Sequence, residues 1–321
     1  MATIVRKGAG QRATSYAAWM QRSGTLVLIL GLVAGCGGGD DSTQPTSQRP
    51  DDGPTFEDPG PIHVHGLGIN PKDGALLVAT HTGLFRAPEG EQTAKRVAGR
   101  FQDTMGFTVV GPNTFLGSGH PDAREDLPPF LGLIRSTDAG RSWKEVSLMG
   151  KSDFHVLEAS GKRVYGFGSN YETREAEFLV SGDGGESWDK RSPPGGVASL
   201  AISPTDPEKV VAAIQGGPAN DGLYASDDAG RSWQPLIDRV GLLAWTESGL
   251  LALVDAEGVV SGSDDGGEEW EEVGEVGGQP AAFEAAEDDL LAALHDGTVK
   301  QSRDGGRTWS VRSEPRATVT Q

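Results

Sequence analysis

The chain contains six histidines, the side chains with the most versatile chemistry near neutral pH. A neutral imidazole binds Cu, Zn, Fe or Ni, and it can also act as a general acid or base. The alternative is structural, with the rings bonding to loop carbonyl groups around a watery channel. No fixed-spacing ligand motif such as HExxH or CxxC is present, so a metal site would combine distant residues. The histidines are His63, His65, His81, His120, His155 and His295.

A second possible chemistry is glycoside hydrolysis, which commonly requires two carboxyl groups facing the substrate. The chain offers acids for this role, but no visible motif pairs them. One tyrosine lies directly beside a glutamate, with an arginine two residues further on at Arg174. The candidate catalytic residues are Glu172, Asp103, Asp153 and Tyr171.

Five copies of one octet, S-x-D-x-G-x-x-W, reveal the elements that would position these residues. The tryptophans are 45, 45, 37 and 39 residues apart, a period that fits four short strands per propeller blade. In each octet the aspartate can accept bonds from turn N–H groups, and the glycine supplies a positive φ. The tryptophan opens the next strand and buries its ring between sheets. These structural residues are Asp138, Asp183, Asp228, Asp265, Asp304, Trp143, Trp188, Trp233, Trp270 and Trp309.

Three apolar segments precede each octet, and a first unit with a degenerate turn at 88–91 brings the number of units to six. The sequence therefore predicts an all-β, six-bladed β-propeller over residues 61–313, with a C-terminal tail at 314–321. Radial closure would leave few exposed strand edges. The first strands of the units are expected near His65, Met105, His155, Ser199, Leu243 and Phe283.

This arrangement predicts that the histidines gather at one mouth of the propeller. Strands alternate in direction, so the start of the first strand and the end of the second share a mouth, and the octets lie at the other. His63 and His65 are two residues apart, so both rings should point to one side of a strand. In the second unit Met105 takes the position that His65 holds in the first. Asp103 and Asp153 take the position of His63 in the second and third units. We expect a metal site for Cu or Zn, or a small-ligand site, at His63, His65, His81, Met105, His120 and His155.

The N-terminal segment predicts export. Four cationic residues precede a short apolar run at 26–30, which is too short for a permanent transmembrane helix. The residues Val33-Ala34-Gly35-Cys36 resemble the bacterial lipobox, which implies cleavage after residue 35 and acylation of Cys36, the single cysteine. We therefore expect a lipoprotein signal peptide at 1–35 and a protein anchored by lipid on the extracytoplasmic face of a bacterial membrane.

Composition limits the remaining possibilities. Residues 36–60 are rich in Gly, Ser, Pro and Asp, which is typical of a disordered tether. The formal charge of −18 argues against nucleic acid as a partner. We expect a monomer whose partners are the membrane, through the anchor, and a small ligand, metal or protein at the propeller mouth.

The octets resemble the Asp-box, or BNR, repeat of sialidases, sortilin-type receptors and photosystem II assembly factors. Together with His63-Val64-His65-Gly66-Leu67-Gly68 and the lipobox, they also resemble a bacterial lipoprotein group labelled glycosyl hydrolase or BNR repeat protein. The sialidase resemblance implies three arginines for the sugar carboxylate, a Tyr–Glu pair and an Asp acid. Phe85-Arg86-Ala87-Pro88 is similar to the first arginine motif, but we expect it on a third strand, away from the axis.

Three functions are consistent with these features. The first is an extracytoplasmic, lipid-anchored binding propeller with a histidine-rich funnel. The second is a sialidase-like glycoside hydrolase, for which no central arginine triad is visible. The third is an assembly or scaffold factor that docks a membrane protein on the broad propeller face.

Overall fold

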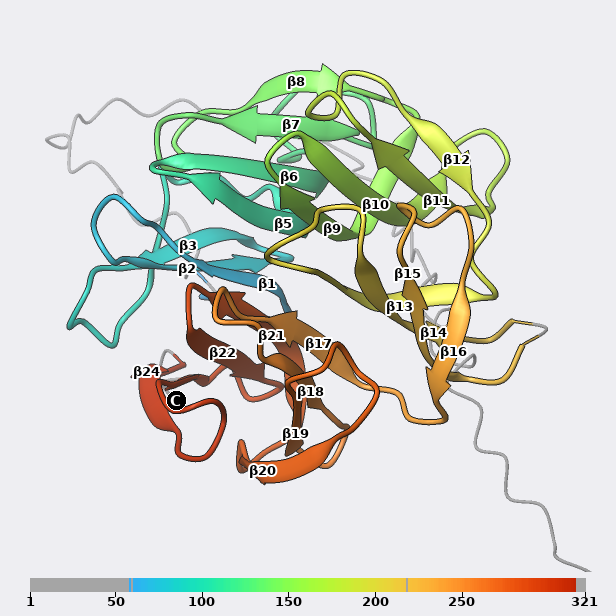
Figure 1. Cartoon of the computed structure of the whole chain (residues 1–321). Helices are drawn as coiled ribbons and strands as arrows, with labels where there is room; N and C mark the ends of the chain where they lie inside the picture. The colour runs from blue at the N-terminus through green and yellow to red at the C-terminus, as the bar shows by residue number, and fades with distance from the viewer. Residues whose placement is uncertain (1–57, 59, 218, 316–321) are drawn as a thin grey trace, which may run out of the picture. The chain divides into compact units, whose positions relative to one another are not determined.

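The computed structural model describes residues 58, 60–217 and 219–315, and the secondary structure in this part of the chain consists of strands. The strands form six antiparallel sheets of four, each built from consecutive strands of the chain (Figure 1). The prediction of an all-β, six-bladed propeller is confirmed. The predicted signal peptide, Cys36 and all of the tether except Asp58 and Gly60 lie outside the described residues. In the described segments we find no helix long and apolar enough to cross a membrane.

Each blade runs outward from the axis in chain order. The first blade comprises β1 (Val64–Ile69), β2 (Leu76–Thr80), β3 (Gly83–Ala87) and β4 (Lys95–Arg96). The second comprises β5 (Asp103–Gly111), β6 (Thr114–His120), β7 (Leu133–Ser136) and β8 (Lys144–Ser147). The third comprises β9 (Ser152–Ser160), β10 (Arg163–Asn170), β11 (Ala176–Ser181) and β12 (Asp189–Arg191).

The remaining three blades repeat this pattern. The fourth comprises β13 (Gly196–Ile202), β14 (Val210–Gln215), β15 (Gly222–Ser226) and β16 (Gln234–Ile237). The fifth comprises β17 (Leu242–Trp245), β18 (Leu251–Val254), β19 (Val259–Ser263) and β20 (Glu271–Glu275). The sixth comprises β21 (Pro280–Ala286), β22 (Asp289–Leu294), β23 (Val299–Ser302) and β24 (Ser310–Ser313).

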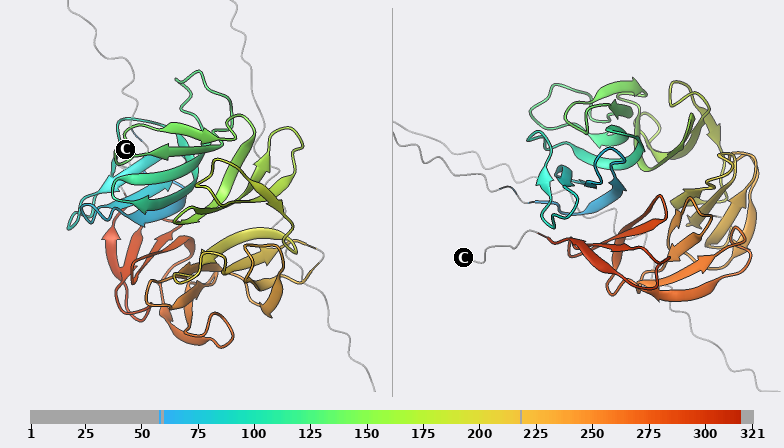
Figure 2. Two further views of the ribbon diagram at one scale, coloured as in Figure 1. Left: turned by 45° about the horizontal axis from the view of Figure 1, so that its top comes forward. Right: turned by 60° about the vertical axis from the view of Figure 1, so that its left-hand side comes forward.

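The blades close into a ring around the innermost strands. Each innermost strand contacts the next, and β21 contacts β1, so the red sixth blade lies beside the blue first blade (Figures 1 and 2). The core is divided into six apolar clusters, one between each pair of neighbouring blades. Burial between blades, where both faces of each sheet are covered, explains why the second strands of the first, fourth, fifth and sixth blades are almost continuously apolar.

The octets form the tight turn between the third and fourth strands of the second to sixth blades. In the second blade, the Gly140 N–H donates to Ser136 Oγ at 2.9 Å. Asp138 Oδ1 accepts from the hydroxyl of Ser136 and from the N–H of Ser142, both at 2.9 Å. Gly140 has φ = 81°. The five octet tryptophans pack into five of the inter-blade clusters, so each octet fixes a turn and also joins two blades.

The seam between the sixth and first blades differs from the others because the first blade lacks the octet tryptophan that would pack there. As at the other seams, no strand is shared across it. The guanidinium of Arg312 instead donates to the carbonyl groups of Glu91, Pro88, Ala87 and Gly74 at 2.9–3.3 Å. The Glu314 N–H donates to the Gln92 carbonyl at 2.9 Å. The ring is therefore closed by hydrogen bonds to Gly74 between β1 and β2 and to residues 87–92 from the end of β3 onward, and by apolar packing between the two blades.

Candidate functional site

The ends of the inner strands in the first three blades bring four histidines and two aspartates together. His65 lies at the start of β1, and His81 follows β2. Asp103 begins β5 and pairs in register with His120 at the end of β6. Asp153 and His155 lie near the start of β9. All of these residues lie at the mouth away from the octet turns, because the strands within each blade are antiparallel.

Two glycines make this arrangement possible. A Cβ atom on Gly119, which has φ = 131°, would lie 2.1 Å from the carbonyl oxygen of Asp103. A Cβ atom on Gly168 would lie 1.8 Å from the carbonyl oxygen of Asp153. In both blades the second strand can approach the first closely only because it carries glycine there. The Phe154 N–H also donates to the buried hydroxyl of Ser118 at 2.9 Å, which ties β9 to β6.

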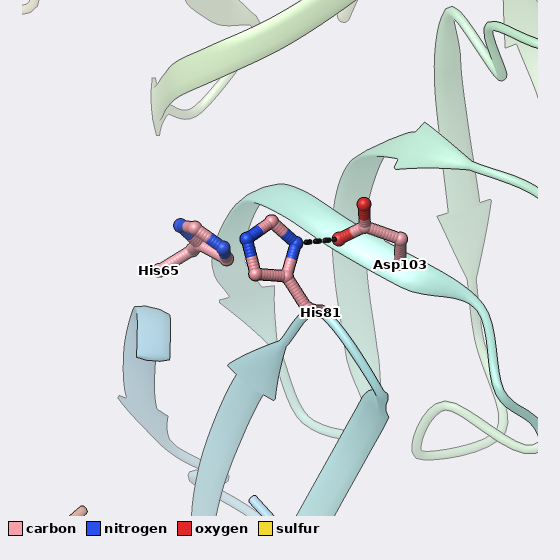
Figure 3. Close-up of side chains that lie close together, drawn as sticks. All are labelled: His65, His81 and Asp103. Carbon is pink, nitrogen blue, oxygen red and sulfur yellow. Dashed lines mark hydrogen bonds and ion pairs between the residues drawn. The ribbon is translucent and has the colours of Figure 1, made fainter. Parts of the chain in front are cut away.

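His65, His81 and Asp103 form the tightest group, which we call the first group. One potential ligand atom from each residue lies within 4.8 Å of the others. His81 Nδ1 is 2.9 Å from Asp103 Oδ1, and the centroids of the two imidazole rings are 4.3 Å apart. Figure 3 shows the His81 ring between Asp103 and His65. His65 Nε2 is buried and has no hydrogen-bond partner among the described residues.

The charges around the first group favour a neutral His65 beside an ionised Asp103. Burial and the nearby His81 lower the pKa of His65 to about 4, so its imidazole is neutral at physiological pH. Burial acts to raise the pKa of Asp103, but the hydrogen bond from His120 and the proximity of His81 outweigh it and lower that pKa. A neutral imidazole beside a carboxylate is a donor set suited to a divalent transition metal.

His120, Asp153 and His155, which we call the second group, lie next to the first. His155 Nε2 is 3.0 Å and His120 Nε2 is 3.6 Å from the same oxygen, Asp153 Oδ2. His120 Nδ1 is 3.1 Å from Asp103 Oδ2, so Asp103 contacts both groups. The hydrogen bond to Asp103 raises the pKa of His120 against the effect of burial, and the charge of Asp153 adds to the increase.

The other predicted ligands lie less centrally. His63 has φ = 53° and precedes β1, and the strand is irregular between Val64 and Gly66. Strand alternation therefore does not apply to His63, which lies outside the strand, yet its ring centroid is 5.3 Å from that of His81, as the ring of His65 is at 4.3 Å. Met105 lies where β5 bulges between Thr104 and Phe107, so alternation does not define its direction either. His295 is exposed at the end of β22 in the sixth blade, outside the two groups.

An aromatic side chain that was not predicted from the sequence, Phe130, borders the second group. The Phe130 ring lies 5.6 Å from His120 and 5.4 Å from Tyr171, centroid to centroid. The Arg174 guanidinium lies over the Tyr171 ring at 4.6 Å. Tyr171, Glu172 and Arg174 are exposed on the loop between β10 and β11. Of the four candidate catalytic residues, Asp103 and Asp153 are thus bonded to histidines, whereas Tyr171 and Glu172 lie on this outer loop.

The arginine of the sialidase-like segment lies away from the axis. Arg86 is on β3, the third strand of its blade, and its guanidinium is 2.7 Å from the carboxylate of Asp73. This position agrees with the expectation from the sequence. The ion pair gives Arg86 a structural partner outside both groups.

A cavity of about 910 Å³ opens among the opposite ends of the inner strands and is lined by residues from all six blades. Glu158 on β9 and Glu284 on β21 interact with each other in this cavity. Burial and the neighbouring carboxyl raise the pKa of Glu158, and burial raises the pKa of Glu284 to about 7. This pair was not predicted from the sequence, although each glutamate follows closely on the start of a segment expected to be an innermost strand.

Comparison with known proteins finds a sortilin-type family similar to the middle part of the chain. The Sortilin-Vps10 family model (Sortilin, neurotensin receptor 3) matches residues 132–260. The human VPS10 domain-containing receptor SorCS2 is 28% identical over 125 residues, which are 37% of this chain. The chain spans only about a tenth of the length of that receptor.

Solved structures of low sequence identity share the fold. A gluconolactonase from Xanthomonas campestris has a TM-score of 0.57 at 12% identity, covering 74% of this chain and 84% of the gluconolactonase. An ancestral GH74 enzyme has a TM-score of 0.50 at 13% identity, covering 80% of this chain and 39% of the enzyme. These likenesses show the propeller architecture alone.

Proposed function

Because the chain is a six-bladed Asp-box propeller with imidazoles and carboxylates gathered at one mouth, we propose that it is a binding propeller for a divalent transition-metal ion. The first group, His65, His81 and Asp103, holds the ion. Zn²⁺ and Cu²⁺ are the expected ions, because both accept imidazole nitrogen and carboxylate oxygen together. The excess of acidic residues over the whole chain favours cations over anions at its surface.

The observation that supports this proposal best is the state of His65. Its Nε2 is buried without a hydrogen-bond partner among the described residues, and its imidazole is neutral because burial lowers its pKa to about 4. A buried polar atom without a partner normally costs free energy. In the tautomer with the proton on Nδ1, this nitrogen carries a lone pair that a metal ion would use. The ligand atoms of His81 and Asp103 lie within 4.8 Å and would complete the site.

Isothermal titration of the full-length chain with Zn²⁺ tests the proposal. His65→Ala and His81→Ala should each weaken binding by more than about tenfold, since a direct ligand contributes at least as much as the partner that orients it. His295→Ala is the matched control, because this exposed histidine lies outside both groups and its loss should leave the affinity unchanged. Equal affinity in His65→Ala and the unaltered chain would show that the proposal is wrong.

We also propose that the propeller is held on the extracytoplasmic face of a bacterial membrane by acylation of Cys36. The support is the sequence alone, in which the apolar run ends in Val33-Ala34-Gly35-Cys36. Expression in a bacterial host with labelled palmitate should label the unaltered chain and place it in the membrane fraction. Cys36→Ala should remove the label, whereas Ser42→Ala in the same segment should retain it. Labelling that persists in Cys36→Ala would contradict the anchor.

A further inference from the structure

We infer that the histidine-rich mouth holds two divalent transition-metal ions, one at the first group and one at the second, with the carboxylate of Asp103 between them. This inference rests on the proposed function and extends it from one ion to a pair. The second ion would be bound by His120, Asp153 and His155. The following observations on the second group carry the inference.

Asp153 is a buried carboxylate with an incomplete set of partners. Its side chain is only 4% exposed, and its Oδ1 has no hydrogen-bond partner among the described residues. A buried carboxylate is costly unless opposite charge and hydrogen bonds surround it. The two imidazoles near its Oδ2 leave Oδ1 unsatisfied. A cation at this position would supply the missing charge.

Two imidazole nitrogens already converge on Asp153. The Nε2 atoms of His155 and His120 lie 3.0 Å and 3.6 Å from Asp153 Oδ2. The side chains of His155 and His120 are 46% and 39% exposed, so both rings have room to turn about an ion. Two nitrogens and one carboxylate are the same donor types as in the first group. Among the described residues, the first group alone has its ligand atoms within 4.8 Å of one another, so an ion at the second group requires one of these exposed rings to turn toward it.

His120 can offer one ring nitrogen to an ion while Asp103 holds the other. Its Nδ1 is 3.1 Å from Asp103 Oδ2 and donates to it, whereas its Nε2 is 3.6 Å from Asp153 Oδ2, too far for a hydrogen bond. With the proton on Nδ1, the lone pair of Nε2 is available to a metal ion. The Nδ1–H bond to Asp103 would remain and would orient the ring, as partners of metal-bound histidines commonly do.

Asp103 links the two groups. Its Oδ1 contacts His81 of the first group at 2.9 Å, and its Oδ2 contacts His120 of the second at 3.1 Å. Pairs of metal ions that share a carboxylate are a recurrent arrangement in proteins. The two carboxylates and four histidines of the groups provide donors for both ions without using the same side chain twice, apart from Asp103.

Metal content of the full-length chain after equilibration with Zn²⁺ and removal of free ion tests the inference. The unaltered chain should retain two ions, His65→Ala one, His155→Ala one, and the double variant none. The ion that His65→Ala retains should be bound at the second group, and the ion that His155→Ala retains should be bound at the first. Each must therefore be lost in the double variant. His295→Ala should retain two, and melting of the metal-free variants checks that each is folded.

The outcomes separate the inference from the proposed function. One retained ion that is lost in both single variants means one shared site, which overturns the inference and leaves the proposed function standing. No retained ion in the unaltered chain overturns both. Loading with Cu²⁺ adds a second readout, since two neighbouring Cu²⁺ ions should give a spin-coupled resonance signal that each single variant lacks. Two uncoupled Cu²⁺ signals at full occupancy would overturn the placement of Asp103 between them.

Discussion

At the scale of single residues, Asp103 occupies the key position of the candidate site. One carboxylate accepts hydrogen bonds from His81 and from His120, one on each oxygen. These bonds fix the orientation of both rings and determine which ring nitrogens are left for an ion. The resulting ionised Asp103 also offsets the positive charge that a metal would bring.

Asp103→Asn should therefore weaken Zn²⁺ binding by about tenfold to a hundredfold, because the amide keeps the shape but loses the charge and one acceptor. Isothermal titration measures the change. Asp73→Asn is the matched control, since Asp73 is bonded to Arg86 and to Asn70 away from both groups. An unchanged affinity in Asp103→Asn would exclude Asp103 from the site.

At the scale of the structural element, the octet turn determines the fold because its requirements are local. The serine, aspartate and glycine satisfy the turn within eight residues, and the tryptophan extends the turn into the inter-blade core. The sequence therefore predicted the blades and the first three strands of each from turn residues and apolar segments. The third-strand position of Arg86 was predicted for the same reason.

Substitutions at two turn glycines distinguish the free-energy cost of backbone strain from the cost of overpacking the core. Gly185 has φ = 91° in an octet, and a Cβ atom there would lie 2.0 Å from Leu133 Cδ2, which is fully buried. Gly90 has φ = 79° in the degenerate turn of the first blade, with open space around it. Gly90→Ala should cost about 1 kcal/mol of unfolding free energy from strain. Gly185→Ala should cost about 1–3 kcal/mol more because of the overpacked core.

Urea unfolding of both variants measures this difference. The two glycines share the positive φ, so backbone strain cancels in the comparison. Equal destabilisation in the two variants would mean that octet turns do not pack rigidly against the neighbouring blade.

The candidate site was predictable only in part, for reasons that also lie at the level of elements. The mouth follows from strand direction, so the positions of His65, His81, His120 and His155 could be anticipated. The irregularities near Val64 and Met105 could not, because a bulge depends on contacts between strands rather than on local sequence. The apposition of Glu158 and Glu284 requires the ring to close, which a reading of separate blades does not provide.

At the scale of the whole molecule, closure of the ring depends on the seam between the sixth and first blades. Arg312 donates to four carbonyl groups there, and no shared strand reinforces the contact. Arg312→Ala should lower the unfolding free energy by about 1–2 kcal/mol, because four carbonyl acceptors, three of them in partly buried bonds, lose a charged donor together. Arg303→Ala, whose side chain is 75% exposed, is the control for urea unfolding. Equal stability of the two variants would remove Arg312 from the closure.

The pair of half-buried carboxyls that line the cavity should make stability depend on pH. Burial raises the pKa of Glu284 to about 7 and that of Glu158 well above its usual value, so folding favours the protonated forms. The stabilisation is complete below the unfolded pKa of about 4.5 and is lost as the pH rises through about 7. The unaltered chain should lose on the order of 2 kcal/mol relative to Glu284→Gln between pH 5 and pH 8.

Melting temperatures of the two proteins across this range give the comparison. Glu247 is an exposed acid that lines the same cavity as the pair. The melting temperature of Glu247→Gln should change with pH as that of the unaltered chain does. A constant difference between the unaltered chain and Glu284→Gln at all pH values would contradict a titrating pair.

The central claim, that the mouth of the first three blades binds a transition-metal ion, is tested most directly by anomalous diffraction. Crystals of the full-length chain grown with Zn²⁺ would be measured on both sides of the zinc absorption edge. The account predicts an anomalous peak in contact with His65, His81 and Asp103. Peaks confined to exposed carboxylates elsewhere, with none at these three residues under saturating Zn²⁺, would contradict it.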